Sequence, residues 1–374
     1  IALGTGSIMI LLIPEFIDDN NIGKLHGYFR WNIKVFLVMS LSFLAVTLTI
    51  IGTSFAIIDL TPIGYYKLQL TFYGICLSPL FAYLFLQDSL LRAEKQYYYS
   101  AILSWGGFSI FTIIAISIIQ SYKGQLSAGT ALLGMGIACM TVIAIQLPII
   151  LKHLPSDITK SDPVYNTKRW FKAALQMTGA DILATLIALM SILTLEFFDP
   201  NPHDVAHYAV CAVIAASLLT LNTAISVLIT PWIKEDLDKN NTTHLQHLID
   251  YTNNFKMIIA GILLALLVVL GKPLLTSFGT NYTHLYIPLI IFSVGNYIVV
   301  CLGSSISLLL YSNNRKVVEY IRLLDLAIVI GLSALLIPTY KLTGAAVALS
   351  LGGVFAKLAA AIMVRMGHHH PATR

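Results

Sequence analysis

The sequence predicts an all-α integral membrane protein, on the strength of its composition, the length of its apolar runs and the placement of its charges. Of the 374 residues, 57% are apolar and only 11% are charged, and the mean hydropathy is +0.80. Runs of twenty or more apolar residues recur along the chain, and such a run crosses a hydrocarbon core of about 30 Å at 1.5 Å per residue. We therefore expect helices that cross a bilayer repeatedly.

Turn and cap residues divide the chain into ten complete apolar segments. We expect transmembrane helices at 32–58, 66–91, 98–121, 127–152, 171–196, 207–233, 254–277, 283–311, 316–337 and 341–366. An earlier apolar stretch ends at Pro14 and is too short to span. It has neither the basic region nor the small-residue cleavage site of a signal peptide, so we expect it to be the remainder of a truncated helix.

Lys and Arg residues alternate between the two sides of the predicted helices. Eighteen of them, with Lys256 and Arg322 included, fall on one side and four on the other. Loops rich in Lys and Arg face the cytoplasm. We therefore expect a multi-pass protein of a bacterial inner membrane whose C-terminus is cytoplasmic, together with loops 18–31, 92–97, 153–170, 234–253 and 312–315.

An internal repeat relates the two halves of the chain. Segment 10–39 aligns with 227–260, 90–103 with 308–324, and 125–140 with 341–357, all at offsets close to 217 residues. Parallel repeats of this kind are related by an axis along the membrane normal. The repeat predicts two six-helix bundles with the first helix of the first bundle missing: an N-lobe at 1–152, a linker at 153–170, a C-lobe at 171–366 and a tail at 367–374.

Several segments carry a resemblance to a known family. They are DVAHY (204–208), ISVLITPWIKE (225–235), SFGTNYTHLYIPLIIFSVGN (277–296), IPTYKLTGAAVALSLG (337–352) and IPEF (13–16). In their order and spacing, the chain resembles the polysaccharide (O-antigen type) flippases of the multidrug/oligosaccharidyl-lipid/polysaccharide exporter superfamily.

The resemblance implies a MATE-like, V-shaped transporter with a central cavity. It also implies a cargo, a polyprenyl-pyrophosphate-linked oligosaccharide that moves from the cytoplasmic to the outer leaflet by alternating access. An H⁺ or Na⁺ gradient is the candidate source of drive, no cofactor is expected, and a glycan polymerase or other assembly machinery is a candidate partner. The chain departs from the expected pattern in two ways, since the first helix is missing and the first half carries no internal cationic cluster.

Ionisable residues inside predicted helices are the first candidates for the site, because burying them in hydrocarbon is costly. Asp181 lies near the middle of its helix, with Gln176 five residues before it, and either binds a proton in the cavity or makes a structural contact. Asp325 and Lys357 lie on the last two helices. They either form an intramembrane salt bridge or line the cavity separately, and snorkelling is an equal alternative for Lys357.

Polar residues near helix ends and within spans complete the candidate set. Gln87, Asp88 and Arg92 lie at one helix end, where Asp88 and Arg92 are expected to form a local i, i+4 ion pair unless Arg92 contacts a pyrophosphate. Asn222 and Asn296 either bind sugar or join helices. A cytoplasmic entrance is expected at Arg30, Lys34, Lys168, Arg169 and Lys172, where topology signalling and lipid anchoring are alternative roles.

No motif indicates catalysis, a metal site or nucleic-acid binding. The sequence has neither a nucleotide-binding loop nor a metalloprotease helix, and no basic face of the kind that binds nucleic acid. Two alternatives to the oligosaccharide flippase stay open, a cation-coupled multidrug exporter and a lipid II flippase. The first would want several intramembrane carboxylates close together, and the second would carry two extra helices.

Overall fold

The computed structural model describes residues 4–19, 21–57, 62–124, 127–154, 161–198, 202–238, 242–303, 305–306, 309, 315–364 and 366. The chain divides into two compact units, Ile1–Thr178 (unit 1) and Gly179–Arg374 (unit 2). Nine helices of the described part are long and apolar enough to cross a membrane. The protein is therefore a multi-pass membrane protein, while the predicted lobe boundaries stay a prediction.

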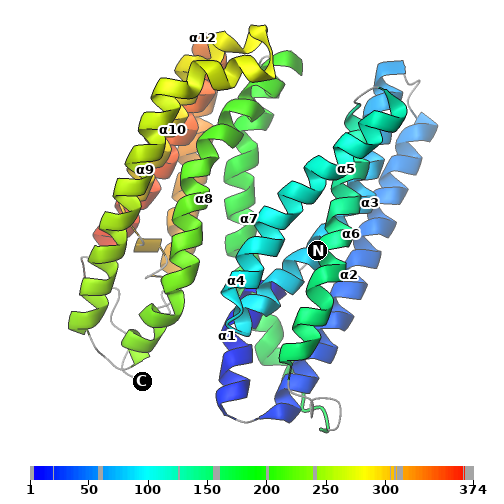
Figure 1. The fold of residues 1–374 in the computed structure, drawn as a ribbon, viewed down its shortest axis with the longest axis vertical. Coiled ribbons are helices and arrows are strands. Elements are labelled where there is room, and N and C mark those ends of the chain that lie inside the picture. The colour runs from blue at the N-terminus through cyan, green and yellow to red at the C-terminus, as the bar shows by residue number, and fades with distance from the viewer. Residues whose placement is uncertain are drawn as a thin grey trace. The chain divides into compact units, whose positions relative to one another are not determined.

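Unit 1 is built from helices that follow one another along the chain (Figure 1). They are α1 (Thr5–Asp18), α2 (Ile22–Ile57), α3 (Pro62–Ala93), α4 (Tyr97–Tyr99), the π-helix η1 (Ser100–Gly107), α5 (Phe108–Lys123), α6 (Ala128–His153) and the first part of α7 (Thr167–Phe198). α6 packs against both α3 and α5, and α1 packs against α3.

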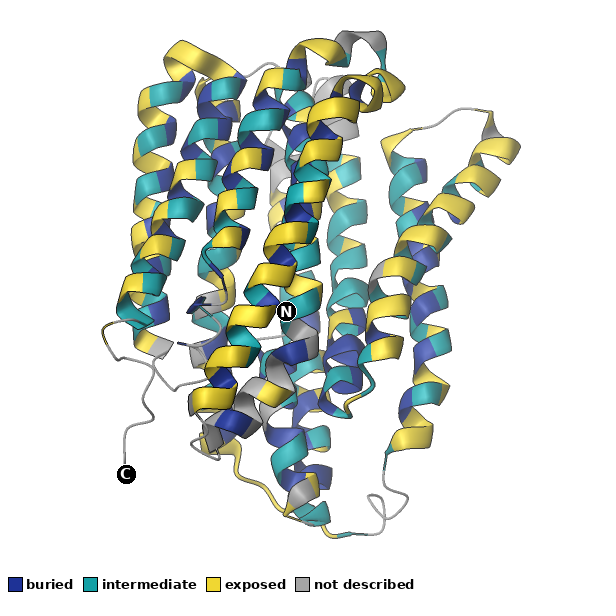
Figure 2. Cartoon of the chain, turned by 60° about the vertical axis from the view of Figure 1, so that its left-hand side comes forward, coloured by how far each residue is buried: buried dark blue, intermediate teal, exposed yellow. Residues whose placement is uncertain are grey.

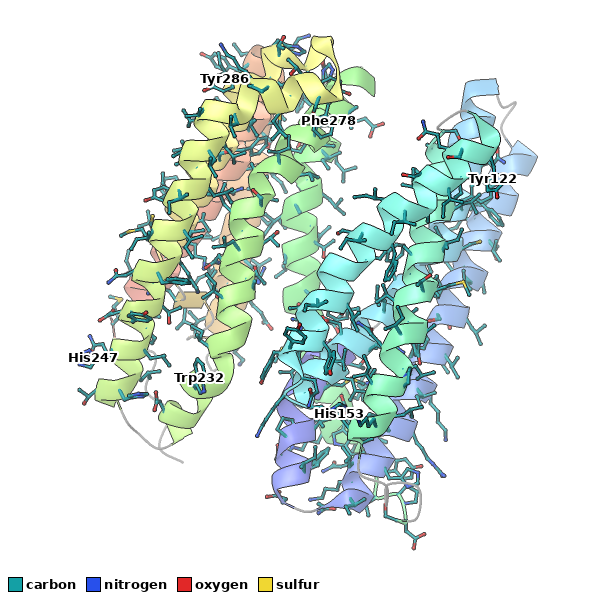
Figure 3. All side chains as sticks on the ribbon, in the orientation of Figure 1. Tyr122, His153, Trp232, His247, Phe278 and Tyr286 are labelled. Carbon is teal, nitrogen blue, oxygen red and sulfur yellow. The ribbon has the colours of Figure 1, made fainter. Side chains whose placement is uncertain are left out.

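Unit 2 contains the rest of α7, then α8 (Pro202–Asp238), α9 (Thr242–Phe278), the 3₁₀ helix η3 (Thr280–Leu285), α10 (Tyr286–Cys301) and α12 (Arg315–Met363). α10 is its central helix, since it packs against α8, α9 and α12. Figure 3 places Tyr286 and Phe278 at one end of this unit and Trp232 and His247 at the opposite end. Aromatic residues at both ends suit the two interfaces of a bilayer.

The observed helices differ from the predicted spans mainly in length. α1 continues through Pro14 to Asp18, and α2 and α9 begin ten and twelve residues before the predicted spans 32–58 and 254–277. The amphipathic stretches before these spans are the first turns of the same helices, so the helices extend beyond the apolar region. The predicted spans 316–337 and 341–366 form α12, in which Lys341 alone has non-helical angles (φ 47°, ψ −127°). Part of 283–311 and the tail 367–374 lie outside the described residues.

Many large apolar side chains are exposed, and Figure 2 shows exposed residues along much of the length of the helices. On α2 alone, Leu37, Leu41, Val46 and Ile50 are each more than half exposed. Water would make such a surface costly, whereas lipid tails accommodate it. The exposed apolar surface is thus consistent with the membrane assignment.

A buried aromatic cluster in unit 1 joins three helices. Phe16, Tyr28, Trp31 and Trp170 come from α1, α2 and α7, and the rings of Trp31 and Trp170 lie 5.7 Å apart between centroids. Four buried aromatic rings contribute large apolar areas to this core. The cluster therefore fixes the start of α7 against α1 and α2.

The described end of the predicted linker lies along α2. Val164 N–H donates to the Gly23 carbonyl at 2.9 Å, and the His26 Nδ1 lies 2.7 Å from the Ser161 carbonyl oxygen. A Cβ atom on Gly27 would lie 2.2 Å from the Val164 carbonyl oxygen, so only glycine permits this approach. Within 153–170, residues 155–160 lie outside the described part.

Candidate functional site

Five charged side chains on the helices of unit 2 interact with one another, and we call them the unit 2 charge cluster. Its members are Asp181 on α7, Lys256 on α9, and Arg322, Asp325 and Lys357 on α12. Lys256 has no exposed surface and Asp325 is 8% exposed, whereas Arg322 and Lys357 are half-buried and Asp181 is exposed. Placing charges in an apolar interior is costly unless they interact with other charges or polar groups.

Electrostatic interactions connect the members of the unit 2 charge cluster. Arg322 is attracted to both Asp181 and Asp325. Lys357 is repelled by Arg322, and Lys256 is repelled by Lys357. Three cationic side chains thus lie with two carboxylates, so the cluster carries an excess of positive charge when all five groups are ionised.

The two lysines of the cluster donate hydrogen bonds to uncharged acceptors. Lys256 Nζ donates to Ser226 Oγ at 2.7 Å, and Lys357 Nζ donates to the Gly303 carbonyl at 3.1 Å. Gly303 lies in the turn that follows α10, and the Asn253 side chain packs directly against it. Lys357 and Asn253, which precedes Lys256 on α9 by three residues, therefore both contact this turn.

Two polar atoms of the cluster are buried without a hydrogen bond in the described part of the chain. Asp325 Oδ1 and Arg322 Nε are buried and have no hydrogen-bond partner among the described residues. Gly352 makes room for the Asp325 carboxylate, because a Cβ atom there would lie 2.8 Å from Oδ1. Buried polar atoms without a partner cost free energy, so the cluster has unused capacity to bind a polar ligand.

The two predicted asparagines differ in their environment. Asn296 Nδ2 donates to the Ala215 carbonyl at 2.9 Å and joins α10 to α8, which is the helix-joining role. Asn222 Oδ1 is buried without a partner in the described structure. Asn222 precedes Ser226 by one turn of α8 and so lies on the helix face that reaches Lys256.

In unit 1, Asp88 and Arg92 form the predicted local ion pair. Arg92 Nη2 lies 2.6 Å from Asp88 Oδ2, and Ser100 Oγ donates to Asp88 Oδ1 at 2.6 Å and accepts from Arg92 Nε at 3.1 Å. Ser100 is the first residue of the π-helix η1, so this irregular segment supplies the hydroxyl group that bonds to both Asp88 and Arg92. Gln87 is buried beside this pair in sequence, and neither of its amide atoms has a partner in the described region.

Glu94 is a further candidate that the sequence analysis missed. Both of its carboxylate oxygens are buried without a hydrogen-bond partner in the described residues. Burial raises the pKa of this carboxyl from 4.5 to about 7. Its position in a short polar turn between predicted spans gave no sign of burial.

The five predicted entrance residues lie on two neighbouring helices of unit 1. Contact between Trp31 and Trp170 brings α2 and α7 together there. Arg169 lies 3.4 Å from Glu15, and since both side chains are well exposed, this pair contributes little stability. A surface that attracts anions requires exposed cations. All five side chains are exposed, namely Arg30, Lys34, Lys168, Arg169 and Lys172.

Lys256 and Arg322 were counted in the sequence as topology signals, and the structure gives them a different environment. Lys256 is fully buried in α9, and Arg322 lies in α12 one turn before Asp325. Arg322 had a usable signal, because it falls inside a predicted span near another charge. Lys256 had none, since it stands near a span end, where lysine is common.

The remaining predicted residue, Gln176, lies on α7, and its side chain is outside the described part of the structure. Among the described residues, no three His, Cys, Asp or Glu side chains gather closely enough to hold a metal ion. The candidate residues thus fall into separate groups: the charge cluster in unit 2, and the Asp88–Arg92–Ser100 group and the exposed cations of α2 and α7 in unit 1.

Neither a protein-family model nor a curated protein sequence matches this chain. Solved structures do. A point mutant of the Vibrio cholerae MATE transporter VcmN is 17% identical with a TM-score of 0.74, over 98% of this chain and 84% of that one. A MATE in the bent conformation is 12% identical with a TM-score of 0.72, over 98% and 83%. The outward-facing conformation of a multidrug resistance MATE family transporter of the MOP superfamily is 11% identical with a TM-score of 0.63, over 98% and 82%.

The fold is that of the MATE transporters. The likeness extends over nearly the whole chain, which confirms the predicted all-α, MATE-like membrane fold. At identities of 11–17%, it concerns the fold and leaves the cargo open.

Proposed function

We propose that this protein is a membrane transporter that moves a polyprenyl-pyrophosphate-linked oligosaccharide from the cytoplasmic to the outer leaflet by alternating access. The MATE fold supports the transporter class, and the sequence resemblance supports the cargo. The observation that carries the choice of an anionic cargo is the charge balance of the unit 2 charge cluster. Its three cations outnumber its two carboxylates.

An anionic headgroup suits this balance better than a cationic drug does. A site for a cation needs carboxylates that are free to bind it, but both carboxylates of the cluster already interact with Arg322. A pyrophosphate would instead offset the repulsion between neighbouring cations, and guanidinium and ammonium groups both bind phosphate oxygens.

A cation-coupled multidrug exporter is the second candidate. The solved structures of this fold include a multidrug resistance transporter, and Asp325 Oδ1 has no hydrogen-bond partner in the described residues. A lipid II flippase remains a third candidate. Its cargo carries the same pyrophosphate group but a different sugar. In each case an H⁺ or Na⁺ gradient is the candidate drive.

The remaining expectations belong to the same proposal. The Lys and Arg balance supports a cytoplasmic C-terminus in a bacterial inner membrane, and the exposed cations of α2 and α7 suit a cytoplasmic entrance. The internal repeat supports two lobes joined by the linker 153–170.

A gene deletion tests the proposal. Undecaprenyl-linked sugar should accumulate in the inner leaflet of the deletion strain, and the full-length gene should reverse the accumulation. A Lys316→Gln gene should restore export equally well, because Lys316 is exposed and outside the cluster. A deletion that changed only drug sensitivity would refute the flippase and favour the exporter.

A further inference from the structure

Residues 161–166, which we call the strap, run along the start of α2 without forming a helix and end where α7 begins. Two hydrogen bonds hold the strap there. Val164 N–H donates to the Gly23 carbonyl at 2.9 Å, and His26 Nδ1 donates to the Ser161 carbonyl at 2.7 Å, since a carbonyl oxygen only accepts. His26 is 7% exposed, so its bond forms away from competing water. The strap is therefore bonded to α2 at two separate points.

The face of α2 beneath the strap is shaped by two glycines. Gly23 and Gly27 are four residues apart and so lie on the same side of the helix. A Cβ atom on Gly27 would lie 2.2 Å from the Val164 carbonyl oxygen, and one on Gly23 would lie 2.9 Å from the Asp162 carbonyl oxygen. These neighbours are backbone atoms, which cannot rotate away as a flexible side chain does. A larger residue at either position would therefore push the strap off α2.

The strap continues directly into α7. Pro163 lies within the strap and restricts both its own φ and the conformation of Asp162 before it. The Asn166 carbonyl accepts from Trp170 N–H at 3.1 Å in the first turn of α7, and the Trp170 ring packs against Trp31 of α2. A stiff segment that is bonded to α2 and continuous with α7 holds these two helices together.

The contacts of α7 with unit 1 extend beyond its first turn. Ala174 and Met177 are buried in the same core cluster as Trp170. A Cβ atom on Gly4, which precedes α1, would lie 2.6 Å from the Ala174 carbonyl oxygen and 2.8 Å from Thr178 N. Unit 1 ends at Thr178, and α7 continues from there into unit 2. The chain thus passes from one unit to the other within α7, after the strap.

We propose that the strap is a permanent bracket, which stays docked on α2 during transport, so that α2, the strap and α7 as far as Thr178 move as one body. The inference goes beyond the proposed function, because it holds for any cargo. The alternative is a strap that releases α2 in each cycle. The contact with His26 favours the bracket, since release would leave a buried imidazole without its partner.

Hydrogen exchange of the purified full-length protein in nanodiscs tests the docking. The Val164 amide should exchange as slowly as the amides at the start of α2, because it is bonded to Gly23. Gly27→Ala should speed this exchange about tenfold or more. Gly52→Ala is the matched control on the same helix and should leave the exchange unchanged, since a Cβ atom there meets nothing within 4 Å. Equal exchange in the two variants would overturn the docked strap.

A disulfide across the contact tests whether the docking is permanent. A Cβ atom on Gly23 would lie 3.9 Å from Val164 Cβ, a separation typical of disulfides. Once the four native cysteines are replaced by alanine, Gly23→Cys combined with Val164→Cys should therefore cross-link under mild oxidation. Failure to cross-link in a folded protein would contradict the docked geometry.

Transport by the cross-linked protein decides between the bracket and a strap that releases. We expect lipid-linked sugar to move at the same rate before and after oxidation, with Gly23→Ser combined with Val164→Ser as the control for the oxidant. A loss on oxidation that a reductant restores would overturn the bracket. If neither the sugar nor a cationic drug moved in either state, the proposed function would fail, whereas slow exchange of the Val164 amide would still support the bracket.

Discussion

At the scale of a residue, Glu94 links burial to pH. Burial raises the pKa of its carboxyl from 4.5 to about 7, so the folded protein retains a proton that the unfolded chain releases. The free energy of unfolding should therefore fall as the pH rises from about 4.5 to about 7, and stay at the lower value above that window.

Substitution of Glu94 by glutamine should remove this dependence. We expect Glu94→Gln to raise the melting temperature by a few degrees at pH 8 and to change it little at pH 4. Thermal unfolding in detergent at both pH values measures the difference. Glu196→Gln, which removes an exposed carboxyl at the end of α7, is the control. An equal change at both pH values would contradict the burial of the Glu94 carboxyl.

Single residues also mark the limit of the sequence analysis. Asp181, Asp325 and Lys357 were predicted as candidates because they are charges inside apolar runs, and the structure brings all three into one cluster. Lys256 joins the same cluster. From the sequence alone, however, a lysine near a span end is equally able to extend its ammonium group to the membrane surface. Only the packing of α8 and α10 against α9 decides that it is buried.

At the scale of an element, Gly352 sets the approach of two parts of α12. A Cβ atom there would lie 2.4 Å from Val329 Cγ2 and 2.8 Å from Asp325 Oδ1. We expect Gly352→Ala to lower the free energy of unfolding by about 1–3 kcal/mol, because the added methyl group overpacks this contact.

Gly331 provides the matched control on the same helix. A Cβ atom at Gly331 meets nothing within 4 Å, so Gly331→Ala should be neutral or slightly stabilising. Denaturation of both variants in mixed micelles gives the comparison. Equal stability of the Gly352→Ala and Gly331→Ala proteins would contradict the close packing of Asp325 against Gly352.

Element boundaries were the least predictable part of the fold. Apolar runs indicate where a helix is inside the membrane, but not where it ends outside it. For that reason α2 and α9 begin well before their predicted spans. The break between the predicted spans 316–337 and 341–366 was expected at 338–340, whereas helical structure continues through Pro338 and is interrupted at Lys341. Neighbouring helices re-satisfy the backbone groups that a proline frees.

At the scale of the whole molecule, composition and run length were sufficient to predict the all-α membrane fold. Its MATE-like architecture rested on the internal repeat and the resemblance, and the solved structures confirm that fold. The cargo is a different kind of question, because one fold serves several transported molecules. The positive excess of the unit 2 charge cluster is the physical reason for choosing an anionic one.

Transport in proteoliposomes tests that central claim most directly. The full-length protein would be reconstituted with a polyprenyl-pyrophosphate-linked oligosaccharide, and the sugar reaching the outer leaflet would be followed with an added glycosidase. We predict translocation well above the protein-free rate, and at least tenfold slower translocation with Arg322→Gln or Lys357→Gln. Translocation no faster than in protein-free liposomes, together with uptake or release of a cationic drug by the same vesicles, would contradict the account.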